Sequence, residues 1–161
     1  MATTEMEDNL FPEDIDIVDE DLLLDEDDSL LTGYKKGLYF DIEQGDLLLN
    51  GAGQILIGDE IQVWSTWCKK IISTPRYSCD LYSTDIGIDV EKVFAAADRE
   101  EAESILESEI TEALIVDPYG RAMYVQSVVF EWLSDDSIAV EVTVVGHENQ
   151  ILTVDTIIKA A

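Results

Sequence analysis

Basic side chains are scarce in this 161-residue sequence, which has 9 lysines and arginines against 36 aspartates and glutamates. The formal net charge is therefore −27 at pH 7. Because so negative a surface repels phosphate backbones and anionic headgroups, we expect neither nucleic acid nor a membrane surface to be the primary partner. Basic protein surfaces and cations are the partners that this charge favours.

Cysteine and histidine are also rare, with only Cys68, Cys79 and His147 in the chain. This set cannot supply a Cys/His cluster of the usual zinc spacing, which excludes a structural zinc site. No run approaches the roughly 18 to 20 apolar residues of a membrane-spanning helix. The N-terminus lacks the positive and apolar regions of a secretory signal, so we expect synthesis in the cytoplasm, with buried thiols rather than a disulfide.

Motifs of catalysis are missing as well. The sequence has no Gly-x-Ser-x-Gly, His-Glu-x-x-His or P-loop pattern. Paired acids are unavoidable among 36 carboxylates, and glycosidase chemistry further needs one buried and one exposed acid at a fixed separation. The acid run at residues 25–28 lacks the glycine and glutamate of an EF-hand, which leaves only weak divalent binding open. We predict no enzyme, and no catalytic, cofactor-binding or metal-binding residues.

Residues 1 to 33 differ in composition from the rest of the chain. They hold 13 of the 36 acids and no lysine or arginine. Dense like charge favours a solvated, flexible chain, although short apolar runs such as Leu22-Leu23-Leu24 interrupt it. We therefore predict an acidic arm at 1–33 and a folded domain at 34–161. Two interpretations of the arm stay open: a disordered solubilising segment, or one that orders on a partner.

The remaining sequence indicates an α+β fold. Turn clusters at 43–46 and 50–53 divide the stretch 38–57 into two or three short strands. Apolar residues Ile61, Trp64, Cys68 and Ile71 recur at helical spacing, and Asp59 is placed to cap a helix over 59–72. Further helices are predicted over 90–97, where Asp89 can cap the start, and over 100–115.

Strand patterns follow these helices. The segments 123–133 and 138–145 are rich in β-branched and aromatic residues and are joined by Ser134-Asp135-Asp136-Ser137, which predicts a hairpin. Alternation in 138–145 directs Ile138, Val140, Val142 and Val144 to the core. A weaker alternation at 151–158 predicts a terminal strand. The expected architecture is a small, mostly antiparallel sheet covered by two or three helices.

One segment stands out as a candidate contact surface. It follows the first predicted helix and reads IISTPRYSCDLYSTDIGID. Arg76 is one of few arginines, and a guanidinium held by the neighbouring Pro75 can grip a carboxylate or carbonyl of a partner in bidentate fashion. The alternative is that Arg76 pairs with one of the many acids of this chain. The residue pattern alone leaves both open.

The order of these elements resembles the sheath-initiator family of contractile tail baseplates, in the branch found in phages and prophage-derived particles of Gram-positive bacteria. The resemblance runs from about Leu38 to the C-terminus, and some relatives in that family carry a lysozyme label. Members carry a Glu-Pro-Arg or Thr-Glu-Arg triplet after the first helix, which corresponds here to Thr74, Pro75 and Arg76. Thr74 departs from the glutamate of the first group.

The resemblance implies a structural role in assembly. A protein of this family is assembled in the bacterial cytoplasm, sits in the inner baseplate of a virion or tail-like particle in six copies, and starts sheath polymerisation by β-strand exchange with the first sheath ring. The implied partners are the sheath protein and wedge proteins, with tube or hub proteins left open. The implied wedge contact is Thr74, Pro75, Arg76 and Tyr77, and the candidate exchange strand is Ile151, Leu152, Thr153, Val154, Asp155, Thr156, Ile157 and Ile158.

A second hypothesis follows from charge alone. An acidic adaptor or DNA-mimicking inhibitor would occupy a basic groove on another protein, and its binding would weaken steeply with salt because exposed charges are screened. The sequence does not distinguish a phage from a prophage-derived particle, nor does it identify the strands that contact the sheath.

Overall fold

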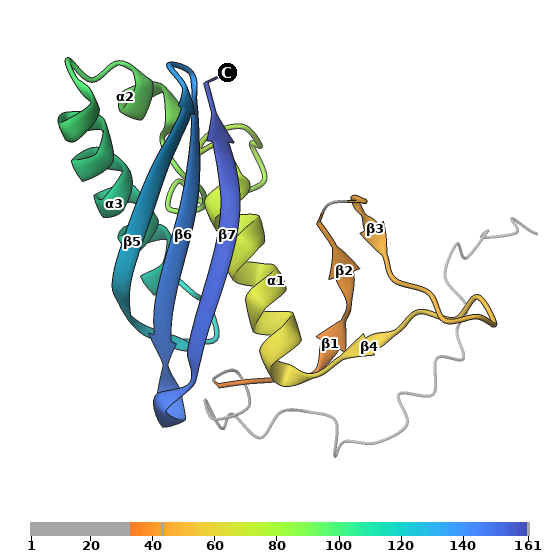
Figure 1. Ribbon diagram of the computed structural model, residues 1–161. Helices are drawn as coiled ribbons and strands as arrows, with labels where there is room; N and C mark the ends of the chain where they lie inside the picture. The colour runs from red at the N-terminus through yellow and green to blue at the C-terminus, as the bar shows by residue number, and fades with distance from the viewer. Residues whose placement is uncertain (1–32, 43, 161) are drawn as a thin grey trace, which may run out of the picture. The chain divides into compact units, whose positions relative to one another are not determined.

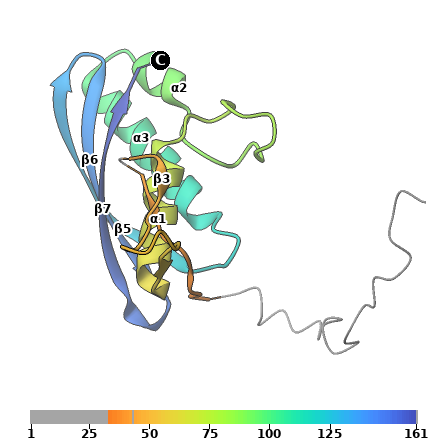
Figure 2. The same ribbon diagram turned by 90° about the vertical axis from the view of Figure 1, so that its right-hand side faces the viewer.

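A three-stranded antiparallel sheet and two helices form two packed layers in the computed structural model, which describes residues 33–42 and 44–160 (Figure 1). The sheet has the order β5 (Ala122–Ser134), β6 (Ser137–Gly146), β7 (Ile151–Lys159). Helices α1 (Glu60–Ser73) and α3 (Arg99–Ile115) cover one face, as Figure 2 shows with the sheet nearly edge-on. The predicted α+β class is confirmed, and the acidic arm lies outside the described residues except for Gly33.

Each main helix begins at an aspartate that caps its first turn. Asp59 accepts a hydrogen bond from the Gln62 backbone at 2.8 Å, and the Gln62 side chain returns one to the Asp59 backbone at 3.0 Å, which forms a capping box. Asp98 caps α3, and Asp89 caps the short α2 (Val90–Phe94). The predicted boundaries of α1 and α3 are therefore correct to within one residue.

The core lies between the sheet and the helices. Trp64 and Cys68 of α1, Leu106 and Ile110 of α3, and Val142 of β6 are all fully buried. On β6 the predicted inward set is confirmed: Ile138, Val140, Val142 and Val144 are buried, whereas Glu141 is exposed. Contacts of α1 with β7 and of α3 with β5 place one helix beneath each edge strand.

A buried ion pair fixes the turn between α3 and β5. The Arg121 guanidinium donates from Nε to Asp117 Oδ2 at 2.7 Å and from Nη2 to Asp117 Oδ1 at 2.9 Å, with both side chains almost wholly buried. The guanidinium lies 5.3 Å from the centre of the Trp67 ring and 5.0 Å from that of Tyr119. The bidentate geometry and two aromatic faces compensate for the desolvation of this pair.

Gly146, at the end of β6, has no room for a side chain. A Cβ atom there would overlap the Tyr34 hydroxyl and lie 2.7 Å from both the Arg121 carbonyl oxygen and Trp64 Cη2. Glycine thus allows the β6–β7 connection to pack directly against the core.

The segment before α1 forms an irregular two-stranded ribbon. Strand β1 (Gly37–Leu38) pairs with β4 (Ile57–Gly58), and β2 (Phe40–Asp41) pairs with β3 (Asp46–Leu47), all antiparallel. An isolated bridge between Leu49 and Ile55 extends the ribbon around the predicted Asn50 turn. The structure therefore contains four very short strands here, where two or three were predicted.

Because Cys68 is buried, the free energy of unfolding should decrease at alkaline pH. Desolvation, the largest cause, raises the pKa of the Cys68 thiol from 9.0 to about 12. Above pH 9 the unfolded chain ionises this thiol while the folded chain keeps it protonated, so stability is lost as pH rises towards the folded pKa. Between pH 7 and 10.5 we expect the free energy of unfolding of the parent chain, measured with urea, to fall by about 2 kcal/mol more than that of Cys68→Ala. Parallel pH curves for the two proteins would contradict this linkage.

Candidate functional site

The Thr-Pro-Arg segment ends α1 and starts a closed loop. Thr74 is the C-cap residue of α1, and its hydroxyl donates to the Lys70 carbonyl at 2.7 Å. The Arg76 N–H donates to the Ile88 carbonyl at 2.7 Å, and the Ile88 N–H donates to the Thr74 carbonyl at 2.9 Å. These two hydrogen bonds join the ends of the loop 77–87.

The Arg76 side chain is committed to groups of this chain. Its Nη2 lies 3.1 Å from Glu109 Oε2, its Nη1 lies 3.9 Å from Glu112, and its Nε donates to the Gly87 carbonyl at 3.2 Å. Only 12% of the side chain is exposed. The structure therefore matches the alternative in which Arg76 pairs with an acid of the same chain. Through these contacts Arg76 holds the loop against α3.

Glu109 is the centre of this network, and the sequence reasoning above did not identify it. Its carboxylate is 5% exposed and also receives Lys92 Nζ at 3.1 Å and the Asp89 N–H at 3.1 Å. Three segments, the loop, α2 and α3, thus meet at one buried carboxylate. A signal was present, because Glu109 falls on the same α3 stripe as the buried residues Ala102, Leu106 and Ala113.

Gly87 lets the loop close against α1. Its φ is +93°, and an added Cβ would overlap the Thr74 carbonyl oxygen and lie 3.1 Å from the Arg76 nitrogen. Any side chain at this position would push apart the two backbone segments that hold the loop.

The loop exposes large apolar side chains among polar and acidic ones. Leu81 is 94% exposed and Tyr77 is 66% exposed. Tyr77 also has a φ of 65°, which is unusual for a residue with a bulky side chain. Beside the loop, a cleft of about 370 Å³ is lined by Arg76, Asp85, Thr111, Glu112, Ile115 and Val116. The apolar Ile115 and Val116 next to the acidic Asp85 and Glu112 suit a partner that carries an apolar anchor and a basic group.

The second predicted surface, β7, is an edge strand with free hydrogen-bonding groups. The Gly146 N–H donates to the Gln150 carbonyl, and the Ala160 N–H donates to the Asp136 carbonyl. The backbone N–H and C=O groups of the even-numbered residues of β7 therefore point to β6. Strand alternation then directs the backbone N–H and C=O groups of the odd-numbered residues to the open edge. These residues are Ile151, Thr153, Asp155, Ile157 and Lys159, and no described backbone group bonds to them there.

The two edges of the sheet differ in regularity. The pairing of β7 with β6 runs from Ile151 to Lys159 without a register shift. The pairing of β5 with β6 has register shifts at three places along its length. Because bulges twist an edge and interrupt its ladder, β5 is poorly suited to accept another strand, whereas β7 is well suited.

Groups for metal binding are not assembled in the part of the chain that the structure describes. No set of three His, Cys, Asp or Glu side chains among residues 33–42 and 44–160 is arranged to hold a metal ion. The raised pKa of Cys68 keeps its thiol protonated at neutral pH. None of the described helices is long and apolar enough to cross a membrane.

Comparison with known proteins decides the family. The family model for the contractile injection system sheath initiator matches residues 36–149, which is more than two thirds of the chain. The chain belongs to this family. This sheath initiator is therefore a structural component of a contractile injection system that interacts with the sheath, and the family part of the predicted resemblance is confirmed.

A solved structure supports the fold. The chain is similar to a proposed tail lysozyme from Geobacter sulfurreducens, with a TM-score of 0.53 and 15% identity over 66% of this chain and 96% of that one. At this identity the likeness concerns the fold alone. No curated protein matches the sequence.

Loss of the Arg76 side chain is expected to destabilise the fold. Arg76→Ala leaves the buried Glu109 with one fewer cation, which we expect to lower the free energy of unfolding by about 2 to 3 kcal/mol. Lys92→Ala should cost less than about 1 kcal/mol, because Lys92 is 57% exposed and its pairing is screened. Urea unfolding monitored by tryptophan fluorescence measures both. Equal losses in the free energy of unfolding of the two variants would show that Arg76 is not the stronger partner of Glu109.

Proposed function

We propose that this sheath initiator joins the first sheath ring by adding a sheath strand to the open edge of β7. The observation that carries the proposal is the uninterrupted row of backbone groups at Ile151, Thr153, Asp155 and Ile157. An added strand would satisfy these groups and extend the sheet to four strands. In this proposal the candidate exchange strand 151–158 acts as the acceptor, a choice between donor and acceptor that the sequence left open.

The loop that follows α1 is the proposed attachment to wedge proteins in the inner baseplate. Thr74, Pro75 and Arg76 shape the loop, and Tyr77 together with Leu81 supplies its exposed apolar surface. Contact with a wedge protein would remove that surface from water, which stabilises association in proportion to the apolar area buried. In this form of the proposal Arg76 is a positioning residue, and the contact itself is made by its neighbours.

The two surfaces have to act on different partners at once. The loop is built on the C-terminal end of α1 and on α3, whereas the open edge is formed by β7 alone. The proposal therefore places the initiator between the wedge and the first sheath ring of a virion or tail-like particle. Six copies around the tail axis are expected from the symmetry of the family, and contacts with tube or hub proteins stay open.

Proline at the open edge should abolish sheath initiation without unfolding the sheet. Thr153→Pro removes an N–H that points to the open edge, and proline is tolerated at such positions because no existing ladder bond is lost. We expect baseplates carrying this variant to bear no sheath in electron micrographs. Thr153→Val, which keeps the N–H, is the control and should support normal sheaths. Sheaths of normal number on Thr153→Pro baseplates would disprove strand addition at β7.

Removal of the exposed leucine should weaken attachment to the baseplate. Leu81→Ser deletes apolar surface that is 94% exposed in the free chain, so the free energy of unfolding should stay within about 0.5 kcal/mol of the parent value. Binding to isolated wedge complexes should weaken by about tenfold if Leu81 anchors the contact. Leu133→Ser, at the end of β5, is the matched control and should bind normally. Undiminished wedge binding of Leu81→Ser would assign the contact to another surface.

A further inference from the structure

The face of the sheet that turns away from the helices carries a hollow. Helix α1 packs beneath β7 and α3 beneath β5, and Figure 2 shows no other described element over the opposite face. Alternation along β6 places Ala139, Glu141 and Thr143 on this outer face, because the even-numbered residues beside them are buried in the core. The hollow has a volume of about 420 Å³ and spans all three strands.

Ala139 forms the floor of the hollow. In the ladder it lies directly between Glu131 of β5 and Ile157 of β7. In the adjoining row, Glu141 lies opposite Val129. All five residues line the hollow. The small methyl group of Ala139 leaves a space among longer side chains, so the hollow has a short floor and taller walls.

Two of these walls are aliphatic. Val129 is 56% exposed and Ile157 is 52% exposed. The solvated face of an antiparallel sheet ordinarily carries polar side chains, so exposed aliphatic residues around a hollow distinguish this part of the face. A partner that covers Val129 and Ile157 with its own methylene groups would remove apolar area from water and so stabilise the contact.

The carboxylates at the hollow lack a cation of their own. Glu131 and Glu141 form no ion pair among the described residues, whereas Asp155 lies 3.5 Å from Lys69. Lys159, the one basic residue on the outer face of the three strands, lies one row beyond the hollow. Glu141 and Asp155 are directly opposite each other, and like charges in this arrangement destabilise a sheet. A cation bound beside them would relieve the repulsion.

An arginine side chain has both properties that the hollow requires. Its methylene groups can lie along Ala139 and Ile157, while its planar guanidinium offers five N–H donors to carboxylates. Glu131 and Glu141 are diagonal neighbours on adjacent strands, which places their Cβ atoms roughly 7 Å apart. One guanidinium between the two carboxylates can therefore donate to both. Lysine offers a compact charge without this fork.

The arginine has to come from a different protein. This chain has three arginines, and each is already paired within the chain: Arg76 with Glu109, Arg99 with Asp135 and Arg121 with Asp117. A second copy therefore has no free guanidinium to offer, and its net charge of −27 repels the first copy. The charge also disfavours a nucleic acid as the occupant.

We propose that the outer face of the sheet is a docking surface for a basic protein, which inserts an arginine over Ala139 and between Glu131 and Glu141. The site lies on the face of the sheet, whereas the proposed sheath contact lies at the β7 edge. A strand added to β7 leaves the hollow open. The inference therefore goes beyond the proposed function and does not depend on it.

Blocked arginine, N-acetyl-arginine methylamide, is a probe too short to extend the sheet. We expect its titration into the full chain to produce saturable NMR shifts of the Ala139 and Glu141 amides. Blocked citrulline, which has a similar shape but no charge, should bind about fivefold more weakly. Absence of saturable shifts at these amides overturns the site. Equal binding of blocked lysine overturns recognition of the guanidinium.

Filling the hollow leaves the charge of the chain unchanged. Ala139→Leu covers the floor, and we expect it to weaken binding of blocked arginine at least about fivefold. Thr143→Leu, on the same face of β6 but outside the hollow, is the matched control and should bind as the parent does. Parent-like binding by Ala139→Leu would contradict insertion over Ala139.

A pair of double variants separates the two carboxylates from the overall charge. Glu131→Gln with Glu141→Gln should abolish the preference for blocked arginine over blocked citrulline. Glu100→Gln with Glu107→Gln removes the same charge from exposed positions of α3 and should keep the preference. Equal losses in the two double variants would assign the binding to net charge and refute the site.

Carboxylate labelling shows whether the site is covered in the assembled particle. Carbodiimide and glycine ethyl ester modify exposed carboxylates, and mass spectrometry locates the label. We expect Glu131 to be labelled in the isolated chain and protected in the particle. Glu131 lies on β5, at the far side of the sheet from the β7 edge, so a sheath strand does not protect it. Equal labelling of Glu131 in both states would overturn the docking surface and leave strand addition untouched.

Discussion

Unpaired backbone groups along β7 are the constraint from which the proposed mechanism follows. A backbone N–H or C=O that loses water must gain a hydrogen bond, and a row of such groups at a regular edge has one efficient partner, which is another strand. The chain does not place this edge alone in solvent. Helix α1 packs beneath β7, and its Lys69 lies 3.5 Å from Asp155, so the edge strand is held in place before a partner arrives.

The buried carboxylate of Glu109 organises the other end of the molecule. It joins Arg76, Lys92 and the backbone of Asp89, and so holds the loop after α1 against α2 and α3. In the proposed attachment, this network lets Arg76 shape the contact surface without touching the partner itself. A loop held at both ends presents Tyr77 and Leu81 with less loss of conformational entropy on binding than a free loop would.

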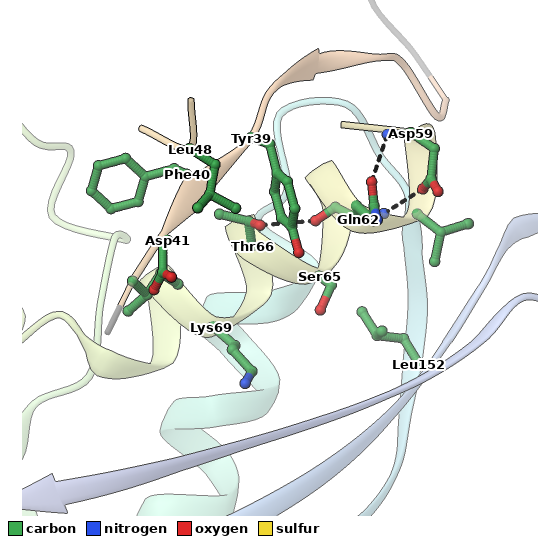
Figure 3. Close-up of a pocket in the computed structure, with 12 residues that line it drawn as sticks. Tyr39, Phe40, Asp41, Leu48, Asp59, Gln62, Ser65, Thr66, Lys69 and Leu152 are labelled. Atoms are coloured by element: carbon green, nitrogen blue, oxygen red, sulfur yellow. Dashed lines mark hydrogen bonds between the residues drawn. The ribbon is translucent and has the colours of Figure 1, made fainter. Parts of the chain in front are cut away.

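Sequence patterns predicted the elements well because their signals are local. Asp59 and the spacing of Trp64 and Cys68 identified α1, and the alternation around Val142 identified both β6 and its buried face. Pairing of Arg76 with an acid of its own chain was one of two open alternatives, and Glu109 was not identified as that acid, since the choice depends on how the loop packs against α3. The cleft of about 540 Å³ between the ribbon, α1 and Leu152 (Figure 3) could not be predicted, because residues that line it, such as Tyr39, Ser65 and Leu152, are far apart in sequence and meet only through the tertiary fold.

Residue-resolved hydrogen exchange of the β7 amides is the most direct test of the central claim. In the isolated chain, the amides of Thr153, Asp155 and Ile157 should exchange rapidly, while those of Val154 and Thr156, which face β6, should be protected. Binding of the sheath subunit should protect all five. Protection of the odd-numbered amides in the isolated chain, or their continued rapid exchange in the complex, would contradict strand addition at this edge.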